Sequence, residues 1–179
     1  MRCSIVMSTR DKAEYLARTL DSIYIQHPSF DFEVIVVDDG STDNTKEVCD
    51  QYEVSRYIKL DTPTYRNPSV ARNVGYRASK GEIIIAQSDE VVHTNADTIE
   101  QLCERLSSNE FLIATVYNYN VSSGKRLQLY TGVRCQRPFF FLGSLWKKDL
   151  YAVGGCDEEF TNPGFDDDWF GDCLIKGSK

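Results

Sequence analysis

No apolar run in this 179-residue sequence is longer than four residues. A helix that crosses a membrane needs about 20 mostly apolar residues in a row, so we expect no transmembrane segment. The opening segment, Met1 to Met7, also lacks the basic and then apolar pattern of a secretion signal. The sequence therefore predicts a cytoplasmic protein, or a soluble part of a larger one.

Basic residues are in the minority, with 20 Lys and Arg against 27 Asp and Glu, and the formal net charge is −7. Proteins that bind nucleic acid along its phosphates, or an anionic membrane surface, present clustered positive charge. The charge balance therefore argues against both of these partners. A phosphate group, if bound, is expected to be bound locally.

Residues that build zinc sites are sparse, since there are only two histidines, His27 and His93, and no C-x-x-C pair. The six cysteines are widely scattered: Cys3, Cys49, Cys103, Cys135, Cys156 and Cys173. This spacing predicts reduced, mostly buried thiols rather than metal ligands or a disulfide framework. We expect both histidines on the surface.

What is present is the composition of a folded globular domain, with 41% hydrophobic and 26% charged residues. Strand-like runs alternate with helix-periodic stretches, which indicates a parallel sheet covered by helices. The expected strands are residues 3–7, 34–37, 56–60, 82–86 and 111–117. Helices are expected after the capping pairs Asp11/Glu14 and Thr94/Asp97, and after an Asn67 cap followed by Pro68. At this length one core is enough, so we expect a single domain over residues 1–179.

The pattern changes after residue 117. Residues 122–125 read as a turn between two antiparallel segments, a short helix is expected from Lys147, and Gly154-Gly155 reads as a turn. An acidic cluster at 166–168 follows, and the chain stops soon after it with no obvious closing element. This half is expected to cover one end of the sheet.

Polar residues follow three of the expected strands. They are Ser8-Thr9-Arg10 after the first, Asp38-Asp39 after the second, and Ser88-Asp89-Glu90 after the fourth. In an open parallel sheet, ligands bind outside the carboxyl ends of the strands. Hydroxyls and carboxylates at one rim suit a ligand with sugar hydroxyls, base edges and a metal-chelated diphosphate.

Four stretches, taken together, extend this reading over nearly the whole chain. They are Ser4 to Arg10, Val34 to Thr45, Ala71 to Gly75 with Gly81-Glu82 and Ser88-Asp89 following, and Gly154 to Phe160 with the aspartates at 166–168 following. In order and spacing they resemble family 2 glycosyltransferases with the GT-A fold. The stretch after the second strand is the most specific of the four.

The resemblance implies a three-layer α/β/α fold. A mostly parallel, Rossmann-like sheet would form the nucleotide-sugar-binding half at 1–117, and a small acceptor-side region would follow at 118–179. It also implies an enzyme that moves a sugar from a nucleotide diphosphate, for which we expect uridine diphosphate, to an acceptor hydroxyl with inversion at the sugar carbon. The acceptor stays open among glycans, lipid-linked groups and proteins.

The resemblance also assigns roles to individual residues. Thr9 and Asp39 would contact the base, Arg72 would contact the base or the diphosphate, and Asp89 would bind Mn²⁺ or Mg²⁺. Such a cation neutralises charge on a diphosphate leaving group. Asp166 or Asp167 would be the general base that takes the proton of the acceptor hydroxyl. The further expected substrate-binding residues are Ser8, Arg10, Asp38, Ser88 and, as a sugar-stacking ring, Trp169.

Two positions depart from the family pattern. Gln87 replaces the first acid of the D-x-D element, so restoring it with Gln87→Asp is expected to strengthen metal binding. The usual Glu-Asp pair is replaced by three aspartates after Phe165, which leaves the choice between Asp166 and Asp167 open. A histidine that commonly follows in the family is not reached, which implies a fragment, a trimmed chain or a minimal variant. These departures keep a second reading open, a degenerate transferase domain that binds a nucleotide-sugar or glycan without transfer.

Overall fold

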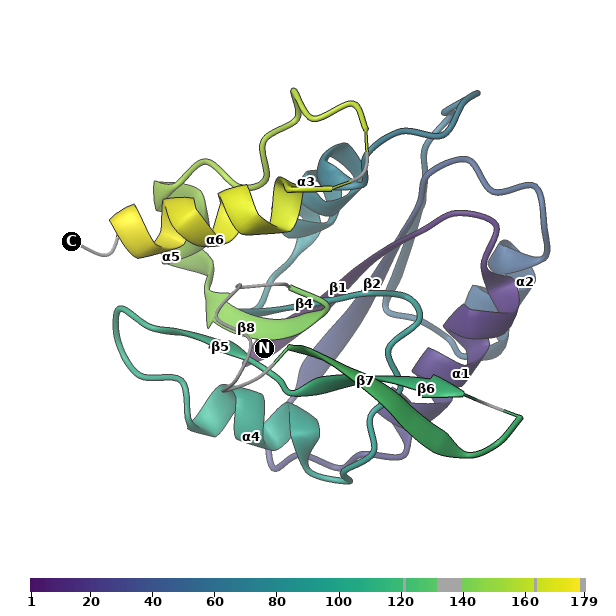
Figure 1. Ribbon diagram of the computed structural model, residues 1–179, viewed down its shortest axis with the longest axis horizontal. Coiled ribbons are helices and arrows are strands. Elements are labelled where there is room, and N and C mark those ends of the chain that lie inside the picture. The colour runs from purple at the N-terminus through teal and green to yellow at the C-terminus, as the bar shows by residue number, and fades with distance from the viewer. Residues whose placement is uncertain (121, 132–139, 163, 178–179) are drawn as a thin grey trace.

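A six-stranded sheet lies at the centre of the computed structural model, which describes residues 1–120, 122–131, 140–162 and 164–177 (Figure 1). In spatial order its strands are β3 (Arg56–Lys59), β2 (Phe32–Asp38), β1 (Cys3–Thr9), β4 (Ile83–Gln87), β8 (Leu142–Trp146) and β5 (Phe111–Ile113). The β3–β2, β2–β1 and β1–β4 pairings are parallel, and β8 is antiparallel to both of its neighbours. The mostly parallel sheet expected from the sequence is confirmed.

Helices cover both faces of this sheet (Figure 1). On one face lie α1 (Ala13–Tyr24), α2 (Thr45–Gln51) and α4 (Thr98–Glu104), and on the other lie α3 (Ser69–Ala78), α5 (Lys147–Ala152) and α6 (Asp166–Gly177). A separate hairpin is formed by β6 (Val116–Asn120) and β7 (Lys125–Thr131), as the predicted turn at 122–125 requires. The arrangement is the predicted three-layer α/β/α fold.

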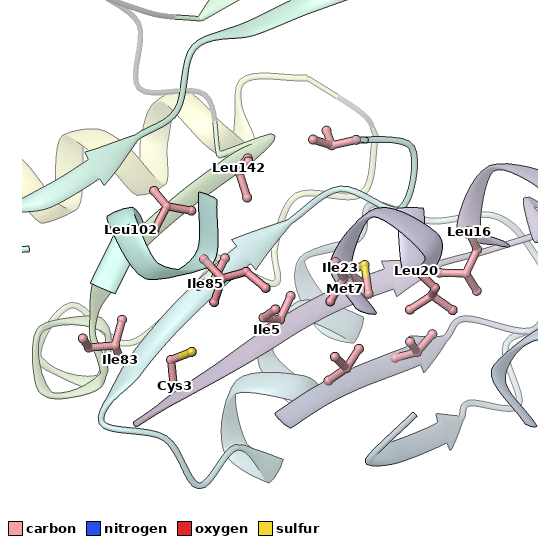
Figure 2. Packing of buried hydrophobic residues seen from close by; sticks show 14 of the residues in the cluster. Cys3, Ile5, Met7, Leu16, Leu20, Ile23, Ile83, Ile85, Leu102 and Leu142 are labelled. Carbon is pink, nitrogen blue, oxygen red and sulfur yellow. The ribbon is translucent and has the colours of Figure 1, made fainter. Parts of the chain in front are cut away.

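Two hydrophobic cores follow from the alternation of side chains along the central strands. Ile5 points into the core under α1, α2 and α4, whereas the next residue, Val6, points into the core under α3, α5 and α6. Figure 2 shows the first core, in which Leu16 and Leu20 of α1 pack over Met7 of β1. Strands buried on both faces need apolar side chains at nearly every position, and this explains the continuous apolar runs of β2 and β4.

Several details differ from the sequence expectations. The strand expected at 111–117 is broken into β5 and β6. The acidic cluster at 166–168 forms the first turn of α6, a helix that the sequence reading did not anticipate. The strand β8 was not anticipated either, and it comes from the region expected on the acceptor side but lies inside the sheet, between β4 and β5. The division of the single domain at residue 117 stays a prediction.

The expected helix caps are not found at their predicted positions. Asn67 accepts a hydrogen bond from the backbone N–H of Ser69 (2.9 Å), but α3 begins at Ser69 and its N-cap residue is Pro68. Asp11 does not cap α1, because its carboxylate instead accepts the N–H of Thr42, and a carboxylate from the next loop, Asp43, accepts the N–H of Ala13 (2.9 Å). The expected cap at Thr94 is also wrong, since α4 begins four residues later, at Thr98.

The cysteines and histidines can be placed as well. Of the five cysteines that the structure describes, all are free thiols; four are buried and Cys173 is partly exposed, while Cys135 lies outside the described residues. His27 is exposed as expected, but His93 is buried, and its expected place on the surface is wrong. Within the described ranges, no helix has the length and apolar character needed to cross a membrane.

Candidate functional site

The carboxyl ends of β1 and β2 meet at one rim of the sheet. Thr9 pairs with Asp38 at the last position of the parallel register, and the N–H of Asp39 donates to the carbonyl oxygen of Thr9 (2.9 Å). Ser8 precedes Thr9 on β1 and is partly exposed. The predicted base-contacting residues, Thr9 and Asp39, are therefore neighbours.

The turn after β2 is held in a fixed shape by Asp38. One carboxylate oxygen accepts the N–H of Ser41 (2.6 Å) and the other accepts the hydroxyl of Tyr57. Gly40 within the turn has a φ of +90°, and a Cβ there would lie 2.4 Å from the carbonyl oxygen of Thr62. Asp38 thus acts on the shape of the loop, and its predicted contact with substrate stays a prediction.

Asp39 is buried, and its carboxylate is held by residues from the segment before α3. The guanidinium of Arg66 contacts both carboxylate oxygens, at 2.7 Å and 3.1 Å, and Thr62 donates its hydroxyl (2.7 Å). Arg10 donates to the carbonyl oxygens of Asp39 (2.7 Å) and Thr64 (2.8 Å) and so ties the same segment to the rim. Arg66 was missed in the sequence because no strand end or motif marks it.

Asp89, the predicted metal ligand, is buried at the end of β4 beside a lysine. Nζ of Lys12 lies 3.5 Å from Asp89 Oδ1 and 3.1 Å from Glu90 Oε2. Burial raises the pKa of Asp89, while Lys12 and the hydroxyl of Thr9 oppose that rise. Although it lies beside this carboxylate, the buried Thr9 Oγ1 makes no hydrogen bond of regular geometry within the described structure. No sequence signal marks Lys12, because its contact with the carboxylates after β4 depends on how the start of α1 packs against that strand end.

The oxygen donors at this point fit a divalent cation that a substrate helps to hold. Mg²⁺ is commonly bound by one or two carboxylates together with substrate phosphates. Asp89 and Glu90 supply two carboxylates, and Thr9 supplies an unsatisfied hydroxyl. Among the described residues, no three or more His, Cys, Asp or Glu side chains gather as a complete metal site.

Gln87, at the first position of the altered D-x-D element, does not face the rim. Its side chain is buried, its amide nitrogen donates to the carbonyl oxygen of Val91 (3.1 Å), and its amide oxygen lies 3.0 Å from His93 Nε2. Burial lowers the pKa of His93 to about 4, so the imidazole is neutral near pH 7. The expectation that an acid at this position would add a metal ligand is therefore not supported by where the side chain points.

On the acceptor side, Arg72 of α3 lies between the two candidate bases at the start of α6. Its Nη1 is 2.8 Å from Asp167 Oδ1 and 3.2 Å from Asp166 Oδ2, and these helices lie side by side in Figure 1. Burial raises the pKa of Asp167; Arg72 lowers it and Asp166 raises it further. Trp169 follows on the same helix with 47% of its surface exposed and with Lys176 over its ring.

Asn73 fastens the glycine turn of the acceptor side to α3. Its amide nitrogen donates to the carbonyl oxygen of Cys156 (2.7 Å), and its amide oxygen accepts the N–H of the same residue (2.9 Å). The preceding Gly154-Gly155 turn has φ values of +84° and +81°, as the predicted turn requires. Asn73 lies in one of the four motif stretches but was not singled out, because nothing in the sequence shows which segment its side chain meets.

The predicted residues therefore fall into two groups. One contains Thr9, Asp39 and Asp89 at the strand ends, and the other contains Arg72 with Asp166 and Asp167 between α3 and α6. Ser88 belongs with the first group, and its N–H donates to the carbonyl oxygen of Phe141 (2.8 Å).

Comparisons with known proteins agree with this geometry. The family model described as Glycosyl transferase family 2 matches residues 4–158. The chain is 32% identical over 134 residues to the glycosyltransferase GlyG of Streptococcus pneumoniae, an alignment that covers 72% of this chain and 44% of that protein. It is 29% identical to the chondroitin synthase of Escherichia coli, over 94% of this chain and 31% of that protein. The chain thus spans less than half the length of these curated relatives.

Solved structures share the fold at low sequence identity. Staphylococcus aureus TarS 1–349 in complex with UDP-GlcNAc aligns with a TM-score of 0.75 and 19% identity, over 99% of this chain and 54% of that one. The mannosyltransferase PcManGT from Pyrobaculum calidifontis, in complex with GDP-Man and Mn²⁺, aligns with a TM-score of 0.72 and 21% identity, over 97% of this chain and 51% of that one.

Proposed function

The chain belongs to glycosyl transferase family 2, and on that premise we propose that it transfers a sugar from a nucleotide diphosphate donor to an acceptor hydroxyl. The observation that carries the proposal is the pair of groups described above. Buried polar side chains at the ends of β1, β2 and β4 offer a nucleotide site, and two carboxylates held by Arg72 offer a base.

We propose a uridine diphosphate sugar as the donor. TarS, which shares the fold, has been solved with UDP-GlcNAc and with UDP, although PcManGT was solved with GDP-Man. Thr9 and Asp39 would contact the base, and Ser8, Arg10, Asp38 and Ser88 would line the donor site. Because Arg66 and Thr62 hold the carboxylate of Asp39 on one side, its orientation toward the base would be fixed before the donor binds.

We propose that the donor binds together with Mn²⁺ or Mg²⁺. Asp89 and Glu90 are the residues that would hold the cation, and its fit rests on their two carboxylates. When bound, the cation would neutralise the charge that develops on the departing diphosphate. PcManGT, with Mn²⁺ in its complex, supports this assignment by its fold alone.

Asp167 is the general base in this proposal, with Asp166 as the alternative. A base is most effective when its pKa lies near the working pH, and burial raises the pKa of the Asp167 carboxyl toward that range. One base on the acceptor side is enough for a single displacement that inverts the sugar carbon. Trp169 would stack on a sugar, since its ring is exposed one turn into the same helix.

A second candidate function is a domain that binds the donor without turning it over. The observations that favour it are the inward-facing amide of Gln87 and the lysine that already contacts Asp89 and Glu90. Both reduce the negative charge available for a metal. The two candidates predict the same nucleotide binding and differ in product formation.

The test of the proposed function begins with nucleotide binding. Calorimetric titration with UDP, ADP and GDP in the presence of Mn²⁺ is expected to favour UDP. Asp39→Ala is expected to weaken UDP binding about tenfold to a hundredfold, the worth of a hydrogen bond to a charged group. Asp31→Ala, at the opposite end of β2 and exposed, is the matched control and should bind UDP as the parent does.

Product formation separates the two candidates. A panel of UDP-sugars and sugar acceptors, followed by mass spectrometry, should detect transfer or donor hydrolysis by the parent. Unchanged UDP affinity in Asp39→Ala would contradict the donor site. Tight UDP binding with no transfer or hydrolysis of any donor would favour the second candidate.

A further inference from the structure

Lys12 lies where the two carboxylates after β4 meet the start of α1. Its backbone is fixed, because its carbonyl oxygen accepts the N–H of Leu16 (2.9 Å) in the first turn of the helix. Its side chain is 41% exposed and reaches Asp89 at 3.5 Å and Glu90 at 3.1 Å, whereas the side chain of Asp89 is only 6% exposed. An anchored backbone thus carries a partly free ammonium group.

The buried carboxylate of Asp89 needs a positive neighbour, since an unpaired buried charge is costly. The nearby Arg10 is engaged with the carbonyl oxygens of Asp39 and Thr64, and Arg18 pairs with Glu14. Within the described part of the chain, Lys12 is the basic side chain that the structure pairs with Asp89 or Glu90. The two carboxylates therefore already have a counter-cation.

We propose that Lys12 is the resident counter-cation of Asp89 and Glu90, and that a divalent cation has to displace it from these carboxylates. The inference rests on the proposed function, because it concerns the same metal site. Two positive charges cannot share the same oxygens without strong repulsion. The four-carbon side chain of a half-exposed lysine can swing away at little cost, whereas a buried carboxylate on the strand end cannot.

A consequence follows for the order of binding. A divalent cation that binds without nucleotide would contact the carboxylates of Asp89 and Glu90, but it must first break their contacts with the Lys12 ammonium group. When a nucleotide diphosphate enters with the cation, its negative charge gives the displaced ammonium a new partner. Metal uptake is thereby tied to the donor.

The experiment measures Mn²⁺ binding to the full chain without nucleotide, by the electron paramagnetic resonance signal of free Mn²⁺. Lys12→Met and Lys12→Gln are expected to bind Mn²⁺ about tenfold more tightly than the parent, because a competing charge is removed, an effect reduced by solvent screening. Lys12→Arg should bind like the parent. Lys148→Met removes an exposed lysine on α5, which begins beside the opposite end of β4, and should leave the affinity unchanged.

A second variant locates the gained affinity. Adding Asp89→Asn to Lys12→Met should remove the gain, and a gain that survives this change would overturn the proposal. Equal Mn²⁺ affinity in the parent and both neutral Lys12 variants would overturn it as well. A separate titration with UDP distinguishes failure of the proposed function from failure of the Lys12 proposal. A parent protein that binds no UDP would contradict the proposed function, whereas the Mn²⁺ affinities of the Lys12 variants would still test the role of Lys12.

Discussion

Arg72 Nη1 lies 2.8 Å from Asp167 Oδ1, and this contact joins α3 to the first turn of α6. The same nitrogen contacts Asp166 at 3.2 Å. The family resemblance assigns Arg72 to the donor and assigns Asp166 or Asp167 to the acceptor hydroxyl. The donor-side residue is thus paired with both acceptor-side carboxylates. A donor diphosphate that recruits Arg72 would take a positive charge away from the base, which makes a carboxylate a stronger proton acceptor.

The first prediction distinguishes the two candidate bases. Asp167→Asn is expected to lower the rate of transfer about a hundredfold to ten-thousandfold without weakening UDP binding, since a base acts on the acceptor hydroxyl. Asp166→Asn should have a smaller effect, because the choice of Asp167 as the base rests on the burial that raises the pKa of its carboxyl. The measurement is kcat with saturating acceptor, alongside UDP titration. Parental rates in both variants would exclude both residues.

The second prediction concerns stability and pH. Burial raises the folded-state pKa of Asp167 above its ordinary value of 3.8, so the folded protein holds this proton more tightly than the unfolded chain. The protonated carboxyl therefore contributes its full stabilisation when the pH is below the ordinary pKa of 3.8. This stabilisation is lost as the pH rises through the pKa of the folded state. Asn resembles the protonated acid and does not titrate. The free energy of unfolding of Asp167→Asn, relative to the parent, should increase with pH across this window in urea titrations.

A difference that stays constant between acidic and neutral pH would show that Asp167 is not perturbed as described. Circular dichroism at each pH checks that the fold is retained.

The third prediction uses two glycines with nearly the same φ angle. Gly40 (φ +90°) and Gly154 (φ +84°) both lie in the left-handed region, but a Cβ at Gly40 would meet the carbonyl oxygen of Thr62 at 2.4 Å, whereas a Cβ at Gly154 would meet nothing within 4 Å. Gly154→Ala should cost only backbone strain, on the order of 1 kcal/mol. Gly40→Ala should cost more and also weaken UDP binding, because the turn that carries Asp39 must move.

Thermal unfolding and UDP titration of both variants give the comparison. The close approach of Gly40 to Thr62 would be irrelevant to the site if the two alanine variants were equally stable and bound UDP equally well. Because the two φ values are similar, the backbone strain of an alanine should be similar at both positions. A difference in stability or UDP affinity between the two variants therefore measures the contact with Thr62.

The sequence predicts the elements that run from β1 to β4 because their signals are local. A β-branched run such as Val34 to Val37 specifies a strand within a few residues. The strand β8 has no such signal, since its short apolar run pairs antiparallel with β4, whose residues lie 55 to 63 positions earlier in the chain. The hydrophobic periodicity of a short segment does not identify a pairing strand so far away in the sequence.

The site shows the same division. Thr9, Asp39 and Asp89 could be found because the ends of parallel strands share one rim. Arg66 and Lys12 could not, because their roles depend on side chains that reach across from other segments. The cap of α1 was misassigned for the same reason, since Asp43, 30 residues away, satisfies the N–H that a local residue was expected to take.

The last prediction concerns Gln87. An acid at this position was expected to restore the D-x-D element, but the Gln87 amide donates to Val91 and contacts His93 in the protein interior. Gln87→Asp would remove the donor to the Val91 carbonyl and place a carboxylate beside a buried imidazole. Loss of that hydrogen bond should lower the free energy of unfolding by about 1–3 kcal/mol.

The new carboxylate should also raise the pKa of His93 from its value of about 4, because a nearby negative charge favours the imidazolium. Nuclear magnetic resonance titration of the His93 ring would detect this shift, with the exposed His27 as an internal reference. Mn²⁺ affinity should stay that of the parent, since the side chain at this position contacts Val91 and His93 in the interior. Tighter Mn²⁺ binding with an unshifted His93 would mean that the acid turns to the rim, and that position 87 is a metal ligand after all.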